Sequence, residues 1–140
     1  MPEPRFPSPF YRVSVKAIIR DRDRVLLSQN NEGKWEVPGG GWEHDEELTT
    51  ALARELDEEL HVEIATIGNI QCVWRDYSSV RGIHYLRLGV PVTLKSHEFR
   101  PDDGDLIEAR FVTREEFLQL PFQKGEEGVL NCIDKIWSNE

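Results

Sequence analysis

Alternation of apolar and polar side chains predicts strands in the first part of the chain. The clearest stretch is 11–20, where every second residue is apolar and most of the residues between are polar. The charged run at 21–24 is expected to turn, and 25–28 to return as a short strand. A further strand is expected at 35–37, and Pro38 ends it because proline has no backbone donor.

The second half of the chain shows the same alternation, with a polar loop in the middle. Glycine and short polar runs mark the places where strands are interrupted or turn back. In chain order, we expect a strand at 62–74 that breaks at Gly68, a hairpin loop at 76–82, a strand at 83–94, a surface loop at 96–105 and a last strand at 107–112.

Helices are predicted where apolar residues recur at helical spacing. Four leucines recur at every fourth position after a run of glycines, and no Gly or Pro occurs between Trp42 and Leu60. This stretch is therefore expected to be an amphipathic helix. Thr113 followed by Glu116 is a capping-box start for a short helix. The final stretch, 126–137, carries apolar residues along one side and is also predicted to be helical.

The order of these elements predicts the fold class. Strands, a helix, further strands and two closing helices are typical of an α/β (α+β) sandwich, a mixed sheet with helices on both faces. A length of 140 residues is that of a single domain, 1–140, which can bury a core without disulfides. Residues 1–9 are rich in proline and are expected to be an irregular arm.

Charge and composition narrow the classes of function. A net charge of −9 and a pI near 5.0 disfavour binding to nucleic acid or to an anionic membrane. A nucleotide is not excluded, because a bound cation reverses the local sign of charge. No apolar run can cross a bilayer and no signal peptide is present, so the protein is expected to be cytoplasmic. Cys72 and Cys132 are predicted to be reduced packing residues, with a disulfide as the alternative.

Candidate chemistry lies where the glycine run at 39–41 precedes the amphipathic helix. Consecutive glycines let the backbone approach a ligand closely, as in a phosphate-binding turn. Glu55, Glu58 and Glu59 fall within about a third of the helix circumference, beside the leucine stripe. Carboxylates are ligands of Mg²⁺, and a cation would relieve a repulsion of roughly 3 kcal/mol between partly buried carboxylates about 6 Å apart. The alternative is a solvated acidic face, since exposed like-charge pairs cost only about 0.2–0.5 kcal/mol each.

The spacing of these residues resembles a family signature. Gly40 is followed after five residues by Glu46, and after seven more by Arg54 and the sequence Glu-Leu-Asp-Glu-Glu-Leu-His-Val. The pattern is similar to the box of the Nudix hydrolases, Gly-x5-Glu-x7-Arg-Glu-U-x-Glu-Glu-x-Gly-U, where U is a bulky aliphatic residue. His61 stands where the family has glycine. This departure concerns the end of the helix more than the chemistry, because a histidine there must adopt a left-handed conformation.

The resemblance implies both a fold and an activity. Trp35-x-x-Pro38-Gly39-Gly40 and the strand-to-helix junction at 108–117 are also similar to the family, so an α/β/α sandwich is implied over nearly the whole chain. The implied reaction is metal-dependent hydrolysis of a pyrophosphate bond in a nucleoside diphosphate linked to another group, by attack of water on phosphorus. The implied cofactor is Mg²⁺ or Mn²⁺, and the implied substrate-binding residues are Gly39, Gly40 and Gly41.

The resemblance also implies roles for single residues of the box. Glu58 and Glu59 correspond to primary metal ligands, and Glu55 to a third ligand or to the general base. Gly40 would offer its backbone carbonyl to the metal. Arg54 would fix a glutamate through a charge-assisted hydrogen bond. The expected catalytic residues are therefore Glu55, Arg54 and Glu58.

Two further sets of acids lie outside the helix. Glu46 is expected to anchor the loop or support the metal ligands. Many members of the family take an additional acid from a loop late in the chain, and three residues could serve here: Asp103, Glu98 and Glu108. Each has the alternative of being a solvated surface acid, as most acids in polar loops are.

Substrate identity and assembly stay open at this point. A non-catalytic nucleotide-binding or sensor domain is the alternative function, although the intact charges of the box argue against it. Oxidised guanine triphosphates, sugar nucleotides, dinucleoside polyphosphates and capped RNA are all candidate substrates, because variable loops and strands recognise the base in this family. The expected partner is a small-molecule nucleotide, and small members of the family often pair as homodimers.

Overall fold

The computed structural model of the protein describes residues 8–122 and 126–138. In the first half, the elements are β1 (Tyr11–Ile18), β2 (Arg20–Asp21), β3 (Arg24–Asn30), β4 (Trp35–Glu36), β5 (Gly39–Gly41) and α1 (Leu48–Leu60). In the second half, they are β6 (Ile64–Ile67), β7 (Cys72–Ser78), β8 (Ile83–Leu94), β9 (Leu106–Val112), α2 (Arg114–Gln119), the 3-10 helix η1 (Glu127–Cys132) and α3 (Ile133–Ile136).

The strands form two sheets that meet at the middle of the molecule. In the larger sheet the order is β5-β1-β8-β6, and β7 also pairs with β8. The central pair, β1 and β8, is parallel, with Val15 opposite Leu88. In the smaller sheet β3 pairs with β2, β4 and β9, always antiparallel. The larger sheet therefore contains both parallel and antiparallel pairs, and a mixed sheet is confirmed.

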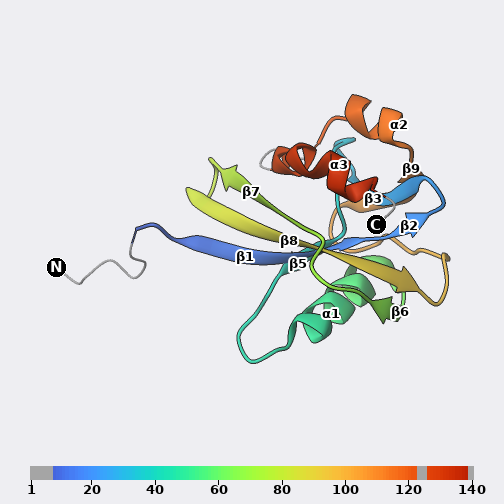
Figure 1. The fold of residues 1–140 in the computed structure, drawn as a ribbon, viewed down its shortest axis with the longest axis horizontal. Coiled ribbons are helices and arrows are strands. Elements are labelled where there is room, and N and C mark those ends of the chain that lie inside the picture. Colours follow the sequence, from blue (N-terminus) through green and yellow to red (C-terminus); the bar gives the residue numbers. More distant parts are fainter. Residues whose placement is uncertain (1–7, 123–125, 139–140) are drawn as a thin grey trace.

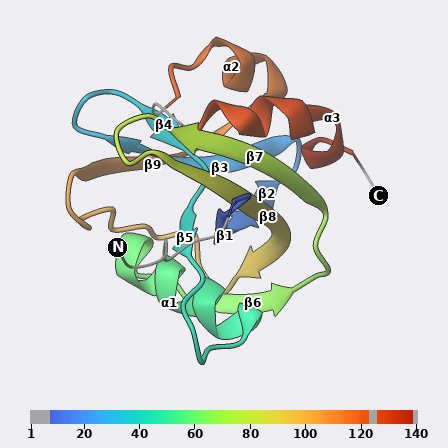
Figure 2. The ribbon, with the colours of Figure 1, turned by 90° about the vertical axis from the view of Figure 1, so that its left-hand side faces the viewer.

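Helices cover both faces of this strand layer (Figures 1 and 2). Helix α1 lies on one face, whereas α2 and α3 lie on the other. The long strands β1, β7 and β8 extend beyond the helices at one end of the molecule (Figure 1). The sandwich predicted from the order of elements is confirmed.

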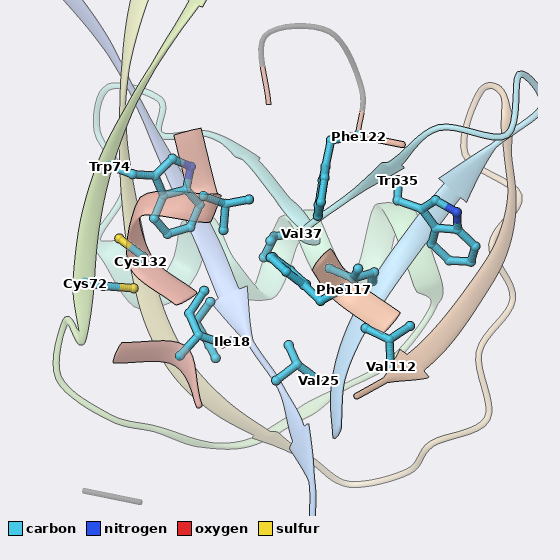
Figure 3. Close-up of a cluster of buried hydrophobic side chains, with 13 residues drawn as sticks. Ile18, Val25, Trp35, Val37, Cys72, Trp74, Val112, Phe117, Phe122 and Cys132 are labelled. Carbon is cyan, nitrogen blue, oxygen red and sulfur yellow. The ribbon is translucent and has the colours of Figure 1, made fainter. Parts of the chain in front are cut away.

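Two cores follow from the alternation of side chains in β1. Val15, Ala17 and Ile19 point toward α1 and pack with its leucines, of which Leu52 and Leu56 are fully buried. Ile18 points the other way and joins the cluster beneath α2, η1 and α3, shown in Figure 3: Val25, Leu27, Trp35, Val37, Cys72, Trp74, Val112, Phe117, Phe122, Val129, Cys132 and Ile136. Both cysteines are free thiols within this cluster, so their predicted reduced state is confirmed.

Most of the predicted strands are present with shifted ends. The strand at 83–94 is observed with the predicted limits as β8, and the interruption near Gly68 separates β6 from β7. The capping box of Thr113 and Glu116 starts α2 as predicted. Residues 1–7 of the expected arm lie outside the described residues.

Three predicted elements were wrong in part. The glycine run is not a free turn but the strand β5, which pairs antiparallel with β1. Helix α1 begins at Leu48 rather than near Trp42, because Asp45 has a φ of 65° that no right-handed helix contains. The closing helix is divided into η1 and α3. A Cβ at Gly128 would lie 2.1 Å from the carbonyl oxygen of Arg75. The backbone of η1 therefore packs closely against β7 at this glycine.

Candidate functional site

The glycine strand β5 lies directly against α1. The N–H of Gly39 donates to Glu59 Oε1 at 2.8 Å. A Cβ atom at Gly40 would lie 2.5 Å from the carboxylate of Glu55, and one at Gly39 would lie 2.1 Å from the carbonyl oxygen of Val15. Gly39 also has a φ of +138°, which favours glycine. Side chains at these positions would separate β5 from the α1 carboxylates or from β1.

Arg54 connects the helix, the glycine strand and the loop between them. Its guanidinium donates to both carboxylate oxygens of Glu46 at 3.1 and 2.7 Å, to the Gly41 carbonyl at 3.0 Å and to Glu55 Oε1 at 2.9 Å. Glu58 Oε2 lies 3.6 Å from Arg54 Nη1. The hydrogen bond with Arg54 is the main cause that lowers the pKa of Glu46. Arg54 therefore contacts glutamates, as the family resemblance implies, and Glu46 anchors the loop.

The three α1 glutamates differ in burial and in charge balance. Glu59 is only 6% exposed, whereas the side chain of Glu58 is 51% exposed. Burial raises the pKa of Glu59 to about 8, although Lys16 opposes the shift. Burial likewise raises the pKa of Glu55 against the opposing contact with Arg54. Burial therefore disfavours the ionised forms of Glu55 and Glu59 more than Lys16 and Arg54 favour them.

The carboxylates do not already form a metal cage. In the described ranges 8–122 and 126–138, no three His, Cys, Asp or Glu side chains converge on one position suited to a metal ion. Their present contacts explain this arrangement, because Arg54 engages Glu55 and the N–H of Gly39 engages Glu59. The helix brings the three glutamates to one side, where Arg54 contacts Glu55 and Glu58 and the N–H of Gly39 contacts Glu59.

His61 ends α1 as a glycine would. It has φ 56° and ψ 46°, and its N–H donates to the Asp57 carbonyl at 3.1 Å. Its Nε2 lies 2.5 Å from Asp102 Oδ1, so the polar loop at 96–105 contacts this end of the helix. The departure from the family signature therefore leaves the end of the helix intact.

The three late acids lie in three different parts of the structure. Glu98 lines a pocket with His61 at the C-terminal end of α1. Asp103 is exposed in the turn before β9, and Glu108 lies opposite Gln29 in the pairing of β3 with β9. Among the described residues, no hydrogen bond or ion pair joins these acids to the α1 glutamates. Their proposed role as a further acid stays a prediction.

A pocket of about 460 Å³ opens beside β5 on the sheet face opposite α1. Alternate residues of β1 and β8 form its floor, and β4, β5, the β7–β8 turn and the start of η1 form its sides. The lining residues are Arg12, Ser14, Lys16, Glu36, Gly39, Gly40, Gly41, Ser78, Ser79, Val80, Arg81, Tyr85, Arg87 and Glu126.

Buried charges form a network at the deep end of this pocket. Arg87 Nε donates to Asp76 Oδ2 at 2.9 Å, Nη1 donates to Ser14 Oγ at 2.9 Å, and Nη2 pairs with Glu126. Lys16 Nζ lies 3.3 Å from Glu126 Oε1. Burial opposes the charge of Lys16, but its carboxylate neighbours, Glu126 foremost, outweigh burial and leave its pKa raised. Both cations in the deep end are therefore neutralised by the protein.

The sequence analysis did not identify this network. The alternation in β1 predicts that Ser14 and Lys16 share one face of the strand. It does not predict which residues pack over that face. In the structure both are buried, at 2% and 3% exposure, because η1 and β8 bring Glu126 and Arg87 over them. A buried face with charged side chains requires partners, and those partners lie far away in the sequence.

Comparison with known proteins identifies the family. The family model described as the NUDIX domain matches residues 10–131. The chain belongs to the Nudix hydrolase family. This confirms the resemblance of the box at Gly40 to Val62. It also favours the enzyme interpretation over a binding or sensor domain, because the family is one of pyrophosphohydrolases that act on small nucleotides.

Individual relatives of this Nudix hydrolase include enzymes of known name. It is 40% identical over 130 residues to the CTP pyrophosphohydrolase of Escherichia coli, covering 86% of this chain and 90% of the relative. It is also 40% identical over 100 residues to the low-salt glycan biosynthesis protein Agl8 of Haloferax volcanii. That match covers 64% of this chain and 64% of the relative, so this chain spans less than two thirds of the length of Agl8.

Solved structures share the fold of the Nudix hydrolase. The MutT protein of Methanosarcina mazei matches with a TM-score of 0.75 at 22% identity, over 96% of each chain. The ORF135 protein of Escherichia coli matches with a TM-score of 0.62 at 29% identity, over 87% of this chain and 90% of that one. Within the described residues, no helix combines the length and the apolar character needed to cross a membrane.

Proposed function

We propose that this Nudix hydrolase cleaves a phosphoanhydride bond in a nucleoside diphosphate linked to another group, with Mg²⁺ or Mn²⁺ held by Glu55, Glu58 and Glu59. The observation that carries the proposal is the contact of β5 with α1. Gly40 lies against the Glu55 carboxylate, and the Gly39 N–H binds Glu59. A backbone that can approach a phosphate closely thus lies beside carboxylates that can hold a cation.

The chemistry of the three glutamates fits a hard divalent cation. All three offer carboxylate oxygens, and burial raises the pKa values of Glu55 and Glu59, so a bound cation would stabilise their ionised forms. Glu58 is exposed enough to change rotamer. Binding would require Glu55 and Glu58 to exchange part of their contact with Arg54 for contact with the ion. When bound, such a cation neutralises phosphoryl oxygens and lowers the pKa of water.

The chain's own residues position the reacting groups. Gly40 is proposed to offer its carbonyl oxygen as a further ligand, and the backbone of 39–41 to contact the phosphates. Arg54 is proposed as a positioning residue, because it binds Glu46, Gly41 and Glu55 at once. Glu55 serves as the third ligand or as the base that accepts the proton of the attacking water.

The pocket beside β5 is proposed to hold the nucleoside. Its deep end presents buried donors and acceptors, among them Lys16, Arg87 and Glu126, which can hydrogen-bond to the edge of a base. The relative named as a CTP pyrophosphohydrolase makes cytidine triphosphate the first nucleotide to test. The diphosphate would then lie along the glycine strand, within reach of α1.

A hydrolysis panel tests the proposal. The purified protein is incubated with CTP, 8-oxo-dGTP, ADP-ribose and a dinucleoside tetraphosphate, each with Mg²⁺ or with a chelator. Running the reaction in ¹⁸O-water shows which phosphorus receives the oxygen of water. We expect metal-dependent release of a nucleoside monophosphate from at least one compound, and loss of roughly 10³-fold in kcat for Glu58→Gln.

The matched control is Asp57→Asn, which removes one carboxylate charge from the neighbouring exposed position of the same helix. It should retain wild-type turnover. Full activity of Glu58→Gln, or hydrolysis that is unchanged in the presence of chelator, would contradict the proposal.

A further inference from the structure

Two arginines lie at the mouth of the pocket. Arg12 on β1 and Arg81 in the β7–β8 turn both line the pocket, and both are exposed. Lys16 and Arg87 at the deep end share Glu126 as an ion-pair partner. In the described part of the chain, no ion pair engages either arginine of the mouth.

Tyr85 is adjacent to arginines at both ends of the pocket. Tyr85 lies opposite Arg12 in the pairing of β1 with β8. Its hydroxyl accepts a hydrogen bond from Arg81 Nη1 at 3.2 Å. The guanidinium of Arg87 lies over its ring, 4.4 Å from the centroid. Tyr85 therefore lies between the paired charges of the deep end and the two arginines of the mouth, which have no carboxylate partner among the described residues.

Arg12 also lies against the glycine strand. A Cβ atom at Gly41 would be 3.1 Å from Arg12 Nη2. On the α1 side, the Gly41 carbonyl accepts a hydrogen bond from Arg54 at 3.0 Å. A diphosphate lying along β5, with its nucleoside in the deep end, would place the group beyond the diphosphate next to Arg12 and Arg81.

The charge of the mouth is unusual for this protein. The whole chain has a formal net charge of −9, yet this rim presents two guanidinium groups close to a proposed phosphate path. Guanidinium groups bind phosphate oxygens through paired, charge-assisted hydrogen bonds. A neutral sugar offers neither the charge nor the matching oxygen geometry.

We propose that Arg12 and Arg81 select substrates by the charge of the group beyond the cleaved bond, favouring nucleoside triphosphates over nucleoside diphosphates joined to a neutral sugar. The inference rests on the proposed function and deepens it. Water adds its oxygen to one phosphorus of the α–β bridge, the bridging P–O bond breaks, and nucleoside monophosphate and pyrophosphate leave with release of one proton. The two arginines bind the pyrophosphate portion of the substrate.

The test compares two substrates that share a base. Steady-state kcat/KM is measured with CTP and with CDP-glucose for the wild type, Arg12→Gln, Arg81→Gln and the double variant. We expect wild type to prefer CTP. Each single variant should lose about 10-fold in kcat/KM for CTP, because a charge-assisted hydrogen bond is lost, and less than about 3-fold for CDP-glucose. The retained CDP-glucose activity shows that the variants are folded.

Two further measurements complete the test. Arg24→Gln makes the same change in net charge at an exposed site outside the pocket, and it should leave the CTP to CDP-glucose ratio unchanged. Inhibition by inorganic pyrophosphate should weaken about 10-fold in Arg12→Gln and Arg81→Gln but not in Arg24→Gln.

The outcomes separate this inference from the proposed function. Equal losses for both substrates, a wild-type preference for CDP-glucose, or unchanged inhibition by pyrophosphate would overturn the selection by charge while leaving metal-dependent hydrolysis intact. Absence of metal-dependent hydrolysis of any nucleotide by the wild type would overturn the proposed function, and the inference with it.

Discussion

Two polar regions on opposite faces of the sheet are built in different ways. On the α1 side, Gly39 to Glu59 supply the whole arrangement from one short stretch of chain, with Arg54 as its centre. On the pocket side, Arg87 joins Ser14, 73 residues away in the sequence, with Glu126 and Asp76 from two further segments. The first region can be assembled by local spacing, whereas the second exists only when the sheet and η1 come together.

This difference predicts whether a substitution in each region should mainly affect turnover or the free energy of unfolding. The α1 glutamates border an apolar core that does not depend on them, so their loss should affect turnover more than folding. The deep charges of the pocket are enclosed by the fold, and removing one leaves its partners buried without compensation. Substitutions in the two regions should therefore move different observables.

The largest effect is expected in the pocket. Arg87→Met should lower the free energy of unfolding by about 3–5 kcal/mol, because Asp76 and Glu126 lose their shared cation while they stay enclosed. Urea denaturation measures this change. The double variant Asp76→Asn/Arg87→Met should recover part of the loss. A change below about 1 kcal/mol in Arg87→Met would remove the distinction between the two regions.

Arg54→Gln provides the opposite case. We expect kcat to fall about 100-fold while the free energy of unfolding changes by less than about 1 kcal/mol, because this side chain is 26% exposed but orients Glu55. Arg54→Lys should restore little activity, since an ammonium cannot reproduce the fork that reaches Glu46, Gly41 and Glu55. Steady-state kinetics and urea denaturation of the same variants measure both effects. A stability loss as large as that of Arg87→Met would show that the region is structural.

Adjacent glycines of β5 offer a matched pair. Gly39→Ala would place a Cβ 2.1 Å from the Val15 carbonyl at a φ of +138°, so we expect it to cost about 2–3 kcal/mol of stability. Gly40→Ala would instead press on the movable end of Glu55, so we expect a cost below about 1 kcal/mol together with weaker metal binding. Thermal unfolding and a metal titration measure both. Equal stabilities of the two variants would disprove the distinction.

Stability is also expected to depend on pH. Burial raises the pKa of Glu59 from 4.5 to about 8, so between these pH values the folded protein holds a proton that the unfolded chain lacks. The free energy of unfolding should then fall as pH rises, by at most about 1.4 kcal/mol per pH unit. Glu59→Gln removes this contribution, so its stability in chelator relative to the wild type should increase between pH 5 and 8. A constant difference across that range would refute the assignment.

The spacing of residues close together in the sequence predicted one part of the site. The helical repeat and the order Gly40, Glu46, Arg54, Glu55 identified α1, its acidic side and the family. It could not show that the glycines form a strand, because the pairing partner is β1. Nor could it show that Arg54 contacts Glu46 and Glu55 at once, which depends on rotamers.

The pocket could not be predicted from the sequence for a related reason. Alternation in β1 placed Lys16 on the face opposite Val15 and Ala17, but only the parallel pairing with β8 and the position of η1 bring Arg87 and Glu126 to it. The closing helix was predicted as one element because apolar periodicity does not register the tight contact of Gly128 with β7. Contacts between distant segments decided each of these cases.

Direct metal binding is the sharpest test of the central claim that Glu55, Glu58 and Glu59 jointly hold a divalent ion beside the glycine strand. Mn²⁺ binding to the protein without nucleotide can be followed by electron paramagnetic resonance. We expect one bound ion in the wild type and in Asp57→Asn, and at least about 10-fold weaker binding in Glu55→Gln, Glu58→Gln and Glu59→Gln. Unchanged Mn²⁺ affinity in all three glutamine variants would contradict the claim.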